Sequence, residues 1–305
     1  MLRRTYLGLD VTGYELRAVS LRRAGKSVAL SGGKFLSLAP GRLTVSPHKL
    51  NIINRSGLVS DLRDLFDGLA GGEERVALSL PDLAGRLLLT EIEAEFKSHA
   101  EGREILRWQM KKKLPAELGE LQLDFQTLRK EESGRSRVLV GLLSKALVEQ
   151  YEEVLEDAGL QPVQIELHAL ALFNYYVQRR FDLGEDFIFI GVENDNLIIS
   201  YFQEKCLTFC RVKYLAAHPD RVFQEVNRSI VGLREQFHTL RRATVFAHIE
   251  PVDVDDYITG LQAVFERDIV LLDPRIDRLA NFASSFDKDD ALRLTAAIGA
   301  AERLL

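Results

Sequence analysis

The sequence has few of the features that mark secreted proteins. Its 305 residues include only two cysteines, Cys206 and Cys210, which are four positions apart in a strand-like stretch. That spacing puts their Cα atoms about 13 Å apart, which is too far for a disulfide. We therefore expect two partly buried free thiols, as is typical of a cytosolic chain.

Long apolar runs and a basic excess are also missing. Asp10 interrupts the first apolar run, which argues against a signal peptide, and HALALFNYYV is too short for a membrane helix. Forty Lys and Arg residues face 45 Asp and Glu residues, for a formal net charge of −5. This balance argues against nucleic-acid binding and against direct adsorption to an anionic bilayer. Work at a membrane would therefore need a protein tether.

What the sequence does contain is a repeated order of elements. Residues 5–37 are rich in β-branched and aromatic residues punctuated by glycine, a pattern that predicts three strands joined by turns. The segment EDFIFIGVENDNLIISYFQEKCLTFCRVKYL repeats this order. Helical patterns and further strands follow in both halves. The chain length suits about two domains, and the repeated order indicates an internal duplication.

Several helices can be placed from spacing and end signals. Apolar residues at three- and four-residue intervals predict a helix in GLVSDLRDLFDGL, and Gly159 marks the end of another over KALVEQYEEVLED. The acidic stretch DKDD at 287–290 suits the start of the last helix. Two strands, LQLDFQTLRK and RSRVLVGLLS, read as a hairpin joined by a polar turn.

Four segments together resemble the actin-like ATPase superfamily and, within it, the family of the type IV pilus assembly protein PilM. They are EILRWQMKKKLPAELGELQLDFQTL, VLVGLLSKALVEQYEEVLEDAGLQPVQIELHALALFNYY, VFQEVNRSIVGLREQF and LTAAIGAAERLL. The related secretion protein GspL shares the cytoplasmic part and continues into a membrane helix, a continuation that we do not expect here.

The resemblance implies an α/β, actin-like (ribonuclease H-like) fold of two lobes around a cleft. The first lobe is expected over residues 1–180, with an inserted small subdomain of the FtsA and PilM type at about 80–163. The second lobe is expected over 181–305, with a small subdomain near 213–242.

The first phosphate-binding loop of the family matches DVTGYELR here. Asp10 is kept, where it either ends a strand or coordinates metal. Thr12 stands at the glycine position, Gly13 comes one place late, and Arg17 replaces the lysine. Tyr14 and Glu15 occupy hydroxyl positions, where a bulky phenol and a carboxylate oppose a polyphosphate.

The other two nucleotide loops are altered as well. In GVENDNL, Gly191 stands where the family has an aspartate, and Glu193 stands where it has a glycine. Ala247 and His248 replace glycines of the adenosine-binding turn. These changes predict a pseudo-ATPase without catalytic residues, metal or cofactor, although residual binding of ATP with magnesium stays an alternative. They also predict that side chains close the cleft, with Tyr14, Glu15, Glu193 and His248 as candidates.

The remaining polar motifs favour structural roles. We interpret His168, on an apolar helix, as a core histidine rather than a ligand, and Lys111–Lys113 as a solvated helix end. No Cys-x-x-Cys or His-x-x-x-His spacing and no Gly-x-Ser-x-Gly elbow occurs in the sequence.

The resemblance implies a cytoplasmic scaffold at an inner-membrane type IV pilus or type II secretion platform. Its partner would be the cytoplasmic tail of a PilN-like bitopic protein, with other platform proteins and self-association possible and nucleic acid not expected. The tail is expected in a groove between the first lobe and the inserted subdomain, with walls at Leu80, Pro81, Arg107, Trp108 and Leu114. The alternative, which we favour for Trp108, is a place in the core of the subdomain. The alternative functions are a working ATP-binding protein and an FtsA-like filament former.

Overall fold

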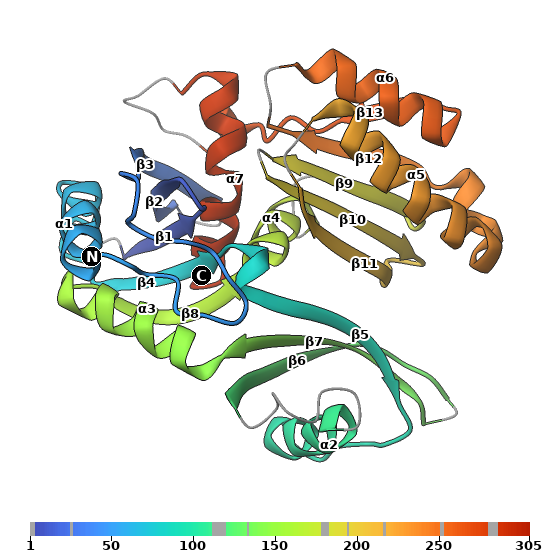
Figure 1. The fold of residues 1–305 in the computed structure, drawn as a ribbon, viewed down its shortest axis with the longest axis horizontal. Coiled ribbons are helices and arrows are strands. Elements are labelled where there is room, and N and C mark those ends of the chain that lie inside the picture. The colour runs from blue at the N-terminus through green and yellow to red at the C-terminus, as the bar shows by residue number, and fades with distance from the viewer. Residues whose placement is uncertain are drawn as a thin grey trace.

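The computed structural model describes residues 4–24, 27–111, 120–132, 134–177, 183–193, 195–215, 218–250, 253–279 and 286–305. Two five-stranded sheets form two lobes, and a third, three-stranded sheet lies beside the first lobe (Figure 1). The strand orders β3-β2-β1-β4-β8 and β11-β10-β9-β12-β13 are equivalent. This equivalence confirms the repeated order of elements from which the internal duplication was inferred.

Each large sheet combines an antiparallel meander with two parallel strands. In the first sheet β1 pairs antiparallel with β2 and parallel with β4, and in the second sheet β9 does the same with β10 and β12. The first sheet contains β1 (Thr5–Val11), β2 (Glu15–Ala24), β3 (Ser27–Ser37), β4 (Arg75–Leu80) and β8 (Gln161–Leu167). The second contains β9 (Phe187–Glu193), β10 (Asn196–Gln203), β11 (Cys206–Tyr214), β12 (Thr244–Ile249) and β13 (Ile269–Leu271).

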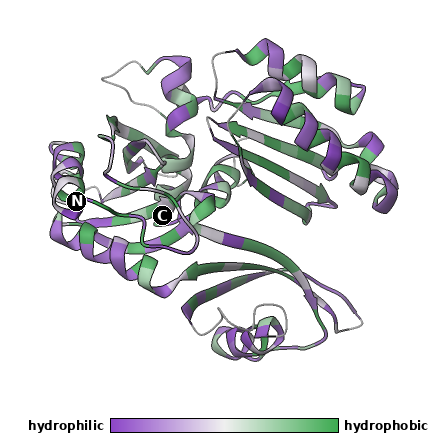
Figure 2. Cartoon of the chain, viewed as in Figure 1, coloured by the Kyte–Doolittle hydropathy of each residue, from purple (hydrophilic) through white to green (hydrophobic). Residues whose placement is uncertain are grey.

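Helices cover the outer faces of both sheets. The first sheet packs against α1 (Arg55–Phe66) and α3 (Lys145–Asp157). The second packs against α5 (Pro219–Gln236) and α6 (Val254–Phe265). Figure 2 shows the central strands mostly in the hydrophobic colour, while the outer helices carry hydrophilic stretches. This is the layering expected when each helix buries one apolar stripe on a sheet.

Two helices, α4 (His168–Val177) and α7 (Lys288–Glu302), lie between the sheets and share one apolar core with both (Figure 1). Glycine permits this close packing. A Cβ at Gly8 of β1 would lie 2.0 Å from the Ala297 carbonyl oxygen of α7, and one at Gly299 would lie 2.0 Å from the Ala171 carbonyl oxygen of α4. The two inner helices are therefore held backbone to backbone against their neighbours.

The inserted subdomain is a three-stranded antiparallel sheet in the order β5-β7-β6 with one helix on one face. It contains β5 (Gly85–Ile92), α2 (His99–Lys111), β6 (Leu121–Lys130) and β7 (Ser136–Ser144). Short 3₁₀ turns occur at Asp82–Ala84, His238–Arg242 and Ile276–Leu279.

The structure differs from the expected domain boundaries at three places. Helix α3 and strand β8 pack in the core of the first lobe rather than in the inserted subdomain, whose expected range was 80–163. Helix α7 returns from the second half of the chain to pack on β1 and β2. Helix α5, within the expected subdomain at 213–242, shares a layer with α6 on the second sheet. These placements follow from the apolar side chains, because each helix buries its apolar face against an apolar face of a sheet.

Two other expectations can be compared directly. Cys206 and Cys210 are both free and lie on β11, as predicted, and burial raises the pKa of the Cys210 thiol to about 11. Within the described ranges, no helix has both the length and the apolarity needed to span a membrane.

Candidate functional site

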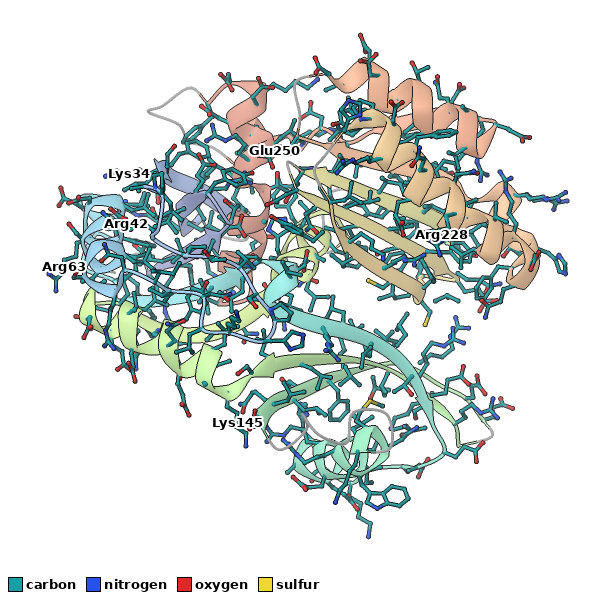
Figure 3. The ribbon with its side chains drawn as sticks, viewed as in Figure 1. Lys34, Arg42, Arg63, Lys145, Arg228 and Glu250 are labelled. Atoms are coloured by element: carbon teal, nitrogen blue, oxygen red, sulfur yellow. The ribbon has the colours of Figure 1, made fainter. Side chains whose placement is uncertain are left out.

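A group of mostly buried charged side chains lies where the carboxyl ends of β1, β9 and β12 face the start of α4. Open α/β sheets generally bind ligands at this edge. We call the group the interlobe cluster, and its members are Asp10, Glu15, Arg17, His168, Glu193, His248, Glu250 and Arg293. In Figure 3 the labelled Glu250 lies between the two lobes, near α7.

His168 connects the two phosphate-loop positions. Its Nδ1 lies 2.8 Å from Asp10 Oδ1, and its Nε2 lies 2.8 Å from Glu193 Oε1. Burial alone would lower the pKa of His168, but the Asp10 and Glu193 carboxylates raise it well above the usual value. Burial would likewise raise the pKa of Glu193, but His168 lowers it. The imidazole is therefore a cation held between two carboxylates from different lobes.

Arg17 makes the second connection between the lobes. Although its side chain is only 1% exposed, it donates to Glu250 Oε1 at 2.5 Å and to Glu250 Oε2 at 3.2 Å. Its Nε donates to Glu15 Oε2 at 2.9 Å, and Glu15 also accepts from Arg293. Despite the desolvation of the guanidinium by burial, Glu250 and Asp10 raise the pKa of Arg17 well above its ordinary value.

His248 lies fully buried beside this network. Its Nδ1 is 2.7 Å from the Tyr176 hydroxyl, and its Nε2 is 3.8 Å from Glu193 Oε1 without a hydrogen bond. Burial lowers the pKa of His248 to about 4, so the ring is neutral at pH 7.

A further polar contact joins the lobes next to the cluster. Asp82 accepts from the backbone N–H of Ala169 at 2.9 Å and from Asn196 Nδ2 at 2.7 Å. The first bond caps the N-terminus of α4 in the manner of an acidic capping residue. Asn196 belongs to β10, so the same carboxylate also binds the second lobe. Burial raises the pKa of Asp82 to about 6.

The charges of the interlobe cluster nearly balance. Four carboxylates, from Asp10, Glu15, Glu193 and Glu250, face the two arginines Arg17 and Arg293 and the protonated His168. Such a network is retained in a protein interior only when its members pair with one another, because an isolated buried charge costs several kcal/mol. The side chains thus provide one another's counterions.

In the first phosphate-binding loop, the backbone N–H groups form hydrogen bonds within the loop and are not free to bind a ligand. Thr12 N–H donates to the Glu15 carbonyl at 2.9 Å, and Thr12 Oγ1 accepts from the N–H groups of Tyr14 and Glu15 at 3.3 and 2.9 Å. A phosphate-binding loop holds its ligand through free backbone N–H groups. In this turn three of those groups are already satisfied.

Magnesium nucleotide does not fit the residues of this cleft. The cavity that Thr12, Gly13, Tyr14, His168 and Glu193 help to line has a volume of about 30 Å³, which is room for about one water molecule. Sites for drug-sized ligands occupy roughly 300–1,000 Å³. A Cβ at Gly191 would lie 3.2 Å from Ile198 Cδ1, so the carboxylate expected in the family would require the Ile198 side chain to shift.

Three members of the cluster have a spacing that a metal ion could bridge. Glu193, His248 and Glu250 place one ligand atom each within 4.8 Å of one another. Both carboxylates are engaged, however, since Glu193 accepts from His168 and Glu250 accepts from Arg17. A metal would have to displace one of these cations, so the donor set fits the existing ion pairs better than an ion.

Most of the predicted loop residues meet at this place. Asp10, Arg17, Glu193 and His248 belong to the cluster, and Tyr14, whose hydroxyl lies 3.3 Å from Arg17 Nη2, borders it. Ala247 is buried in the core of the second lobe, and Gly191 packs against Ile198. His168 is buried, as predicted, but its partners are the two carboxylates of the cluster.

Sequence reasoning missed Glu250 and Arg293. The alternation of β12 could have indicated Glu250, since a charged residue directly follows a buried strand at a ligand-binding edge. No local signal marks Arg293, because its partner Glu15 is 278 residues away.

A second candidate site is a groove of about 380 Å³ between the inserted sheet and β8. Strand β8 is the outermost strand of the first sheet, so it pairs with β4 on one side only. The inserted sheet offers the face opposite α2 to this groove, through side chains that alternate with those in the α2 core. Its members in the groove include Leu87, Gln122, Asp124, Gln126, Leu139, Gly141 and Leu143.

The residues predicted as groove walls lie elsewhere. Leu80 is fully buried in the first-lobe core, and Pro81 borders the 30 Å³ cavity. Arg107 and Trp108 are on α2, which covers the opposite face of the inserted sheet. Trp108 is 67% exposed, so it is not subdomain core. Leu114 lies outside the described residues.

The topology is that of the actin-like ATPase fold, and comparison with solved structures confirms this class. A chain of a PilM–PilN type IV pilus biogenesis complex matches with a TM-score of 0.81 and 17% identity, over 99% of this chain and 98% of that chain. A Bacteroides thetaiotaomicron protein of actin-like ATPase fold and unknown function matches with a TM-score of 0.56 and 12% identity, over 95% and 96% of the two chains.

A third similar structure comes from a secretion system. It is the cytoplasmic domain of EpsL, an inner-membrane component of the type II secretion system of Vibrio cholerae, with a TM-score of 0.51 and 9% identity over 97% and 95% of the two chains. No model of a known protein family and no curated protein sequence matches this chain. At these identities the likenesses establish the fold, as predicted from the sequence.

Proposed function

We propose that this chain is a non-catalytic, actin-like scaffold of an inner-membrane type IV pilus or type II secretion-like assembly platform. It would lie in the cytoplasm and be held at the membrane by the cytoplasmic tail of a PilN-like bitopic protein. The fold shared with a chain of the PilM–PilN complex and with the cytoplasmic domain of EpsL supports this placement. Other platform proteins and a second copy of the chain would be further partners.

The groove along β8 carries the proposal. An open strand edge offers backbone N–H and C=O groups to an extended peptide, which can add to the sheet as another strand. Apolar side chains on both sides of the groove, among them Leu139, Leu143, Val163 and Ile165, would receive alternate side chains of that peptide. Val163 is 45% exposed on β8, as a strand that awaits a partner would be.

The interlobe cluster supports the non-catalytic part. Its ion pairs hold the two lobes together where the actin-like resemblance places a nucleotide, and the self-bonded first loop leaves few donors for phosphate. In the proposal, these ion pairs keep the cleft closed, and the chain does not hydrolyse nucleotide. The alternative, ATP binding with nonstandard loops, predicts saturable binding and is distinguished by titration.

The test is calorimetric titration of the chain with a synthetic peptide of the cytoplasmic tail of the PilN-like protein from the same genome. We expect saturable binding with a Kd in the micromolar range, which corresponds to about −8 kcal/mol. Val163→Asp should weaken it at least tenfold, whereas Val231→Asp, which changes a valine 51% exposed on α5, should not. Absence of binding, or equal effects of both variants, would refute the proposal.

Leu80→Asp is unsuitable for this purpose. Leu80 is fully buried at the end of β4, so the substitution would place a carboxylate in the core of the first lobe. A loss of binding by that variant would report unfolding rather than loss of a groove contact.

A further inference from the structure

Glu166 of β8 is a buried acid with an incomplete set of partners in the proposed groove. It lines the groove, is 8% exposed, and its Oε1 atom makes no hydrogen bond. Arg303, which directly follows α7, forms an ion pair with it, and the Arg303 Nε lies 4.0 Å from Oε2. That distance is too long for a hydrogen bond.

Such a carboxylate is unfavourable in the empty groove. An ionised group removed from water costs several kcal/mol unless opposite charge and hydrogen-bond donors replace the lost hydration. Arg303 is 43% exposed and gives only partial compensation. A ligand that brings a charged donor to Oε1 would therefore recover free energy that the unliganded protein forgoes.

The charge around the groove also favours a cation. The charged side chains that line it are Arg303, which directly follows α7, Asp124 of β6, Glu152 of α3 and Glu166 itself. Asp124 already has a partner, since its Oδ1 lies 2.9 Å from His99 Nε2 of α2. His168, at the start of α4, also acts on Glu166 and lowers its pKa, as does Arg303. With Asp124 paired to His99, the two carboxylates of Glu152 and Glu166 face one arginine, so the groove lining carries an excess of negative charge.

We propose that Glu166 binds a lysine or arginine side chain of the peptide that occupies the groove, with Oε1 accepting a hydrogen bond from it. The inference rests on the proposed function, because it requires an extended peptide along β8. It adds a sequence requirement: a basic residue at one fixed position, flanked by apolar residues that face Leu139, Leu143 and Ile165.

The ionisation of Glu166 gives this proposal a pH signature. Burial raises its pKa to about 7, so near neutral pH about half of the molecules carry a proton there. A basic side chain favours the ionised form, so binding releases that proton and strengthens as pH rises through 7. With a pKa of about 7, the affinity should be about tenfold weaker at pH 6 than at pH 8.

The experiment is selection of random nine-residue peptides displayed on phage against the full chain, its Glu166→Gln variant and its Glu152→Gln variant. Glu152→Gln is a matched control, because it also removes one carboxylate from the groove but at a less buried residue. We expect the wild type and Glu152→Gln to select peptides with one invariant Lys or Arg, and Glu166→Gln to lose that preference.

A calorimetric follow-up uses the best selected peptide. Replacing its basic residue with Gln should weaken binding at least tenfold to the wild type and less than twofold to Glu166→Gln. The pH dependence should likewise vanish in Glu166→Gln. This inference would be overturned if the selected peptides bind in the groove, as shown by competition and by loss of binding in a Val163 variant, but show no preference for a basic residue. The proposed function would remain intact in that case. If no peptide is selected by any of the three proteins, the proposed function itself fails.

Discussion

Arg17 and Glu250 join the two lobes through a pair of hydrogen bonds, at 2.5 and 3.2 Å, although 233 residues separate them in the sequence. The contact is buried and lies beside the second connection, from His168 to Glu193. Separation of the lobes would break both of these charged contacts. Together these ion pairs make the closed arrangement of the lobes self-sufficient.

Loss of the central imidazole should be costly. His168→Ala leaves Asp10 and Glu193 facing each other without their shared cation, and an uncompensated buried charge typically costs about 3–5 kcal/mol. We expect a decrease of that size in the free energy of unfolding measured with urea at pH 7. The exposed His48→Ala is the control, and a change below 1 kcal/mol for His168→Ala would contradict the structural role.

The Arg17–Glu250 contact can be measured by a double-mutant cycle. Arg17→Met and Glu250→Gln should each destabilise the fold, the first more strongly because Arg17 also serves Glu15 and Asp10. The double variant should be more stable than the sum of the single changes predicts, by about 1–3 kcal/mol. Additive effects on the free energy of unfolding would show that the two side chains are not coupled.

The buried position of Glu166 predicts a pH dependence of stability that can be measured without a bound peptide. Its pKa rises from 4.5 to about 7 on folding, so the folded state binds the proton more tightly and loses relative stability as pH rises from 4.5 through 7. Glu166→Gln mimics the neutral form. The variant should equal the wild type near pH 4.5 and exceed its stability by about 3 kcal/mol at pH 8. Urea unfolding across this range checks it, with Glu152→Gln as the control, and a constant difference would contradict the shift.

The local patterns of the sequence, the repeated meander and the apolar helix stripes, predicted the elements and their repeated order, whereas the actin-like fold followed from the family resemblance. Sequence reasoning misplaced α3 and α7, because which sheet a helix covers depends on long-range packing that periodicity does not encode. The three altered loops predicted where the interlobe cluster lies. They did not predict its ion pairs, because Arg17 meets Glu250 and Glu15 meets Arg293 only after the lobes and α7 have packed.

The groove shows the same limit. Its general location, between the first lobe and the inserted subdomain, followed from the family resemblance. The residues that line the groove could not be predicted in this way. Leu80 and Trp108 are both apolar residues near a subdomain boundary, but Leu80 is fully buried and Trp108 is 67% exposed. Only the strand order identifies β8 as the open edge.

Restoring glycines should not restore a nucleotide site. In Glu193→Gly with Ala247→Gly, two loops regain bare backbone, but Gly191 still lacks a carboxylate and Arg17 still pairs with Glu250. The variant removes a partner of His168 and should be less stable by urea unfolding without binding ATP. Robust ATP binding by this double variant would show that the site was blocked by bulk alone.

Titration of the unmodified chain with ATP and magnesium, by calorimetry at pH 7.5, tests the central claim most directly. If the interlobe cluster stands in for the nucleotide, no saturable heat should appear up to millimolar ATP, which corresponds to a binding free energy weaker than about −4 kcal/mol. A dissociation constant in the low micromolar range, together with turnover abolished by Asp10→Ala, would contradict it.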